Sequence, residues 1–77
     1  MDTNTAPAAL ITDAITATNV RNAYRAGAGI VVKDDTHGTY LIDPFVVSVA
    51  VAGNRSRTYA QVADDLNTRA AAAFGLV

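Results

Sequence analysis

The chain has 77 residues, of which 51% are hydrophobic and 17% are charged, and its net charge at pH 7 is −1. This composition excludes disorder along the whole chain. The low net charge argues against a protein whose overall electrostatic field attracts nucleic acid or anionic membranes. A chain of this length forms a single small domain, residues 1–77, with a thin stability margin and no cysteine to reinforce it. Such domains often gain stability by association, so we expect a homo-oligomer.

The first segment is predicted to be a helix from Ala8 to Ala26, ended by Gly27 and Gly29. Residues 1–6 are expected to be flexible, and Asn4 or Thr5 is a candidate helix cap before Pro7. The apolar stripe is divided: Leu10, Ile11, Ala14 and Ile15 share one face, whereas Val20, Ala23 and Tyr24 share another. Either the helix bends or breaks near residues 16–19, or its halves pack on different partners.

A β-hairpin is predicted next. Gly29–Lys33 and Thr39–Asp43 have the composition of strands, and Asp34–Gly38 has the composition of a turn. Pro44 cannot donate a hydrogen bond to a neighbouring strand, so it marks a bend, a bulge or an edge position.

The most apolar run, Phe45–Gly53, is rich in valine and is predicted to be the central strand. Its alternation places Val47, Val49 and Val51 on one face, and the small residues Ser48, Ala50 and Ala52 on the other. A flat face of small side chains permits close packing of a helix or of another subunit. Whether residues 39–52 form one bent strand or two is left open.

The last helix is predicted over Tyr59–Phe74. Thr58 and Gln61 match a capping box, and Gly75 fits a helix stop. The resulting fold class is a small α+β domain in the order helix, β-hairpin, strand, helix, with an antiparallel sheet flanked by two helices.

Candidate catalytic chemistry is sparse in this sequence. His37 lies beside Asp34 and Asp35 in a predicted turn, but it lacks the third oriented group that a catalytic triad or closed metal site needs. No glycine-rich phosphate loop follows the known patterns. We therefore expect no enzyme, no catalytic residues, no cofactor and no metal. Residues 1–7 carry no positive charge before the first apolar residues, so we expect no secretory signal and a cytoplasmic or virion location.

Two likenesses bear on function. The segment Gly29–Pro44 resembles, in its strand–turn–strand spacing, the swapped hairpin of AbrB-like transition-state regulators, which implies a dimeric DNA-binding domain. It has one lysine and three aspartates where a DNA-reading hairpin would want arginines. The expected order of elements is similar to that of gas vesicle shell proteins, an analogy of topology without sequence motifs.

The leading hypothesis is a non-enzymatic, self-assembling structural subunit, such as a small virion, shell or assembly component. It would bury sheet and helix faces between identical subunits, with other structural proteins of the same assembly as further partners and no membrane span. The predicted interface residues are Leu10, Ile11, Ile15, Tyr24, Phe45, Val47, Val49 and Val51. The alternative is a small dimeric nucleic-acid-binding regulator that uses Arg21, Arg25, Arg55 and Arg57. An adaptor domain for an unrelated protein is a third hypothesis.

Overall fold

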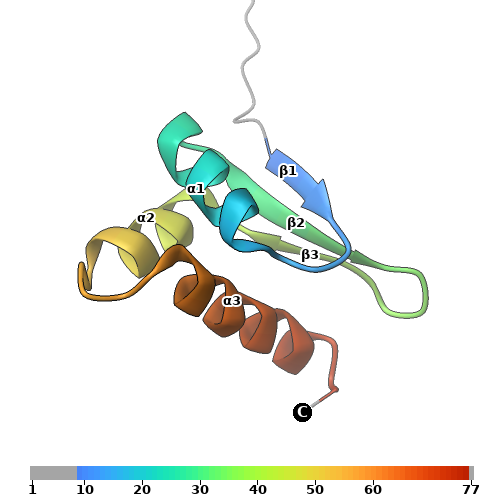
Figure 1. Cartoon of the computed structure of the whole chain (residues 1–77). Helices are drawn as coiled ribbons and strands as arrows, with labels where there is room; N and C mark the ends of the chain where they lie inside the picture. Colours follow the sequence, from blue (N-terminus) through green and yellow to red (C-terminus); the bar gives the residue numbers. More distant parts are fainter. Residues whose placement is uncertain (1–8, 77) are drawn as a thin grey trace, which may run out of the picture.

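The computed structural model describes residues 9–76, which form a small α+β domain with a sheet flanked by helices, as predicted (Figure 1). The expectations for residues 1–6, including the caps at Asn4 or Thr5, lie outside the described residues. The elements in chain order are β1 (Ala9–Thr12), α1 (Ala17–Ala26), β2 (Gly29–Asp34), β3 (Gly38–Ile42), α2 (Pro44–Ala52) and α3 (Tyr59–Ala73).

The sheet is mixed, with β2 in the centre, so the prediction of a purely antiparallel sheet is wrong. The hairpin of β2 and β3 is confirmed, and it pairs Ile30 with Ile42. On the other edge, β1 runs parallel to β2 and pairs Leu10 with Ile30. Parallel neighbours need a long crossover connection, and α1 supplies it.

The predicted helix from Ala8 to Ala26 is wrong in its first half, where β1 and a loop replace it. The helix begins only after Thr16, close to the expected break. Thr16 Oγ1 accepts a hydrogen bond from the Asn19 amide, and Asn19 Oδ1 accepts one from the Thr16 amide. These two bonds form a capping box, which satisfies amides that the helix itself cannot satisfy. Gly27, at φ 65°, ends the helix in the left-handed conformation.

The predicted valine strand Phe45–Gly53 is also wrong, because this segment forms α2. Asp43 caps the helix by accepting a hydrogen bond from the Val46 amide at 3.0 Å, and Pro44 occupies the first turn. Pro44 has no N–H to donate to a neighbouring strand, and its φ, fixed at about −65°, suits the first turn of a helix. A helix start is the conformation that both residues favour.

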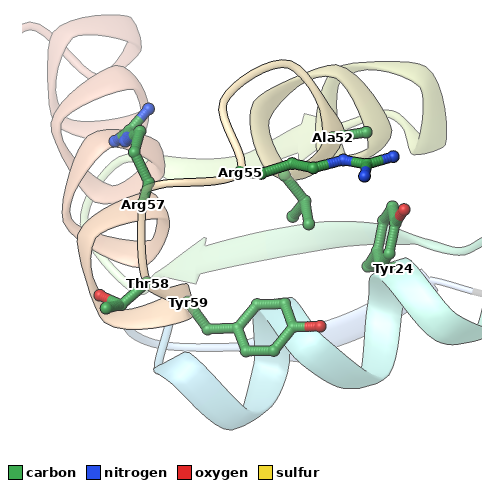
Figure 2. A pocket seen from close by; sticks show the side chains of 7 residues that line it. Tyr24, Ala52, Arg55, Arg57, Thr58 and Tyr59 are labelled. Atoms are coloured by element: carbon green, nitrogen blue, oxygen red, sulfur yellow. The ribbon is translucent and has the colours of Figure 1, made fainter.

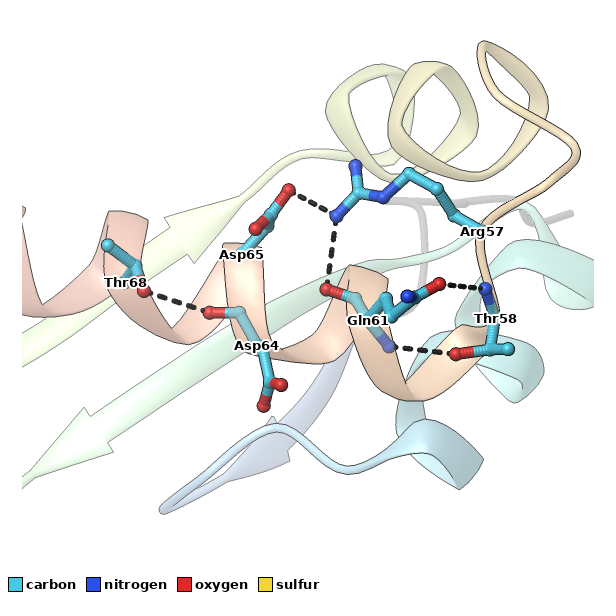
Figure 3. Close-up of polar contacts among 6 residues, drawn as sticks. All are labelled: Arg57, Thr58, Gln61, Asp64, Asp65 and Thr68. Carbon is cyan, nitrogen blue, oxygen red and sulfur yellow. Dashed lines mark hydrogen bonds and ion pairs between the residues drawn. The ribbon is translucent and has the colours of Figure 1, made fainter.

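The last helix is confirmed as α3, although its final helical residue is Ala73 and Phe74 is its cap. The predicted capping box is present: Gln61 N–H donates to Thr58 Oγ1 at 3.1 Å, and Thr58 N–H donates to Gln61 Oε1 at 2.8 Å (Figure 3). Gly75, at φ 79°, takes the left-handed conformation just beyond the helix.

The core lies between one face of the sheet and the three helices, which occupy the same side of it in Figure 1. Strand alternation sends Ile30, Val32 and Ile42 to this side, where all three are buried. The helices contribute buried residues Val20, Ala23, Val47, Val62, Ala63, Leu66 and Ala70. The fold is therefore two layers deep, with helices on one face of the sheet.

Candidate interaction surfaces

The sheet face opposite the helices carries a row of apolar side chains across all three strands. Ile11 pairs with Val31, and Val31 pairs with Leu41, so the three residues are neighbours. Ile11 is 72% exposed and Leu41 is 56% exposed. Within residues 9–76, no helix lies on this face. We call these three residues the apolar row.

A second apolar surface lies on the outer side of α2. Phe45 and Val49, one helical turn apart, are 74% and 52% exposed. Together with Val46 and Ala50 they border a groove of about 350 Å³ between α2 and α3, which also contacts Leu66, Asp65 and Arg69. An apolar helix usually lies buried on all sides, whereas this one buries only Val47 completely.

The eight predicted interface residues do not form one surface. Ile11, Phe45 and Val49 are exposed, but they lie on two different layers of the fold. Leu10, Tyr24 and Val51 are half-buried and pack against the core.

Two of the predicted interface residues, Ile15 and Val47, are only 4% and 0% exposed in the single chain. Both side chains are buried in the core of their own chain. Sequence reasoning missed Val31 and Leu41 as surface residues, although alternation along the two predicted strands of the hairpin already placed them opposite Ile30 and Ile42.

The candidate nucleic-acid residues have separate roles. Arg57 is held by the carboxylate of Asp65 and by the Gln61 carbonyl oxygen, the latter at 3.1 Å (Figure 3). Arg55 lines a cleft beside Tyr24 (Figure 2). Arg21 and Arg25 are exposed on α1. Because Arg57 is engaged within its own domain, the four arginines do not act as equivalent free cations.

His37 has a local partner that explains its position. Its backbone N–H donates to Asp34 Oδ2 at 2.9 Å, and its ring nitrogen Nδ1 contacts the same oxygen. The hydrogen bond from the His37 side chain lowers the pKa of the Asp34 carboxyl below its usual value of 3.8. The imidazole also lies 5.9 Å from the Phe74 ring, between ring centroids, which joins the hairpin turn to the end of α3. This pattern is that of a structural turn.

We predict that the His37–Asp34 interaction stabilises the fold above the usual aspartate pKa and that this contribution disappears on acidification. The sign follows because the pKa of Asp34 is lower in the folded chain, so the unfolded chain binds protons first as the pH falls. Urea unfolding of the native chain and of His37→Ala at pH 6 and at pH 2 checks it. The difference in unfolding free energy between the two proteins should shrink at pH 2; a constant difference would contradict the assignment.

Among residues 9–76, no three His or Asp side chains gather closely enough to hold a metal ion. In the same part of the chain, no helix has the length and apolarity to cross a membrane. Comparisons with protein-family models, with curated proteins and with solved structures found no match.

Proposed function

We propose that this chain is a non-enzymatic structural subunit that self-associates through the apolar row. The observation that supports it most is the placement of Ile11, Val31 and Leu41 side by side on a sheet face without a helix cover. A sheet with one solvated face normally carries polar residues there. Two such sheets stacked face to face would bury both rows at the usual separation of about 10 Å.

Charge complementarity supports a second copy of the same chain as the partner. Exposed Lys33 flanks the apolar row on one side, two residues along β2 from Val31 and opposite Thr39. Exposed Asp43 flanks the row on its other side, just after β3 and beside Gly29. Its Cα lies 3.4 Å from the position that a Cβ on Gly29 would take. In a two-fold pair with antiparallel strands, each Lys33 approaches the partner's Asp43 end. With the strands parallel, the two lysines would face each other and repel.

The apolar row alone is small compared with the roughly 800 Å² that each partner buries in a standard interface. We therefore expect a micromolar dissociation constant for the dimer. A two-fold contact closes on itself, so a larger assembly needs a second contact. The exposed Phe45 and Val49 on α2 lie in the opposite layer and provide a surface for it.

The test is light scattering across a dilution series of the native chain and of two lysine variants. Leu41→Lys should reduce the mass to that of a monomer, because it places a charge in the apolar row. Val49→Lys, the matched control on α2, should retain the dimer and lose only larger species. Both sites are exposed, so both variants should fold. A native chain that stays monomeric at about 100 μM, or a Leu41→Lys variant of unchanged mass, would overturn the proposal.

The nucleic-acid alternative draws less support, since Arg57 already has Asp65 as a partner. It would require salt-dependent retention of DNA that is lost when Arg21, Arg25 and Arg55 are replaced.

A further inference from the structure

A cleft separate from both apolar surfaces lies where the ends of α1 and α2 meet the start of α3. Its volume is about 470 Å³, within the range of small-molecule sites. Tyr24 comes from α1, Val51 and Ala52 come from α2, and Arg55 and Tyr59 come from the loop and from α3. Figure 2 shows the two tyrosine rings and the Arg55 side chain around this space.

The walls of the cleft combine aromatic rings with a cation. Tyr24 and Tyr59 are half-buried and pack against the core, which limits the movement of their rings. Val51 and Ala52 add apolar side chains to the lining. No aspartate is among the residues that line the cleft. A ring could therefore bind between apolar and aromatic walls while an attached anion approaches the guanidinium.

The Arg55 side chain is the available cation of this cleft. Arg57, the other arginine that lines it, turns away toward Asp65 and Gln61. Arg55 has no carboxylate partner among the described residues. The loop that presents it is ordered by Asn54, whose Oδ1 accepts hydrogen bonds from the Ser56 amide at 3.1 Å and hydroxyl at 2.6 Å. The Arg57 N–H also donates a hydrogen bond to the Asn54 carbonyl oxygen at 3.2 Å, which closes the same turn.

We propose that this cleft binds a small planar aromatic molecule that carries one phosphate or carboxylate group. The guanidinium fork of Arg55 matches either anion in a bidentate manner, and the tyrosine rings, with Val51 and Ala52, contact the aromatic ring. This binding site goes beyond the proposed self-association and does not depend on it.

The test is an NMR titration of the isotope-labelled full chain with phenyl phosphate and with benzoate, the two probes that distinguish the anions. For at least one of them, signals of Arg55, Tyr24 and Tyr59 should shift with a dissociation constant on the order of 1 mM, the value expected for a ligand of this size. Inorganic phosphate alone should bind several-fold more weakly than phenyl phosphate. Equal affinity would refute a role for the aromatic walls.

Two variants and one probe of opposite charge decide the role of Arg55. Arg55→Gln should weaken binding roughly tenfold, because a charge-assisted hydrogen bond is lost. Arg21→Gln, which removes an exposed arginine outside the cleft, should leave the affinity unchanged. Benzylamine has the same ring with a positive charge and should not bind. Benzylamine binding as tight as that of the anions, an unchanged affinity in Arg55→Gln, or no shift at about 10 mM anion would overturn the proposal.

Discussion

Replacing Ile30 with alanine is expected to lower the free energy of unfolding by about 2–5 kcal/mol. Ile30 is 0% exposed, lies on the central strand, and is among the largest fully buried side chains of the described residues. Its loss opens a cavity between the sheet and the helices. A chain of this length is expected to have only about 4–12 kcal/mol of stability in total, so much of the population should unfold at moderate urea concentrations.

The same substitution at Ile11 is the matched control, since Ile11 lies on β1 and faces away from the helices. It is 72% exposed, so Ile11→Ala should change the unfolding free energy of the monomer by no more than about 0.5 kcal/mol. Urea unfolding at low protein concentration, monitored by circular dichroism, measures both variants without a contribution from association. Equal losses in the two variants would contradict the assignment of the core to one face of the sheet.

Replacing Asn67 with alanine is expected to cost about 2–4 kcal/mol, because two backbone groups lose their partner at once. Asn67 Oδ1 accepts a hydrogen bond from the Ile15 amide, and Asn67 Nδ2 donates one to the Ile15 carbonyl oxygen, each at 2.9 Å. Ile15 lies in the loop between β1 and α1, and its side chain is buried. Asn67 on α3 therefore takes the place of a sheet or helix partner for this loop.

Thr68 is the control for Asn67 because it is the next residue of α3. Its hydroxyl donates to the Asp64 carbonyl oxygen at 3.0 Å, within the helix and exposed to solvent (Figure 3). Thr68→Ala should therefore change the unfolding free energy by less than about 0.5 kcal/mol. If Asn67→Ala costs no more than Thr68→Ala in thermal or urea unfolding, the two Ile15 hydrogen bonds do not stabilise the fold.

Elements defined by short-range interactions were the most predictable from the sequence. The Thr58–Gln61 capping box is formed by residues three apart, so its sequence pattern predicted the start of α3. The Thr16–Asn19 box has the same geometry but was missed, because asparagine is not the usual residue at the last position of this pattern. The hairpin was predicted because its turn residues lie next to one another.

The candidate surfaces were harder to predict, for a reason that the valine segment illustrates. Its β-branched residues favour a strand by a small and context-dependent free energy. Because the segment is apolar on all faces, it shows no helical period of apolar and polar residues that could be recognised in the sequence. The helix start at Asp43 and Pro44 was the available signal. Consequently Val47 was predicted at an interface and is found in the core.

The sequence by itself determined the small α+β class, the hairpin, α3 and the alternation that separates Ile30 and Ile42 from Val31 and Leu41. Both sets are apolar, so alternation alone does not say which face the helices cover. Only the tertiary structure decided this, through the parallel pairing of Leu10 with Ile30 and the packing of three helices on one side. Such contacts join residues far apart in the chain, and local conformational preferences do not encode them.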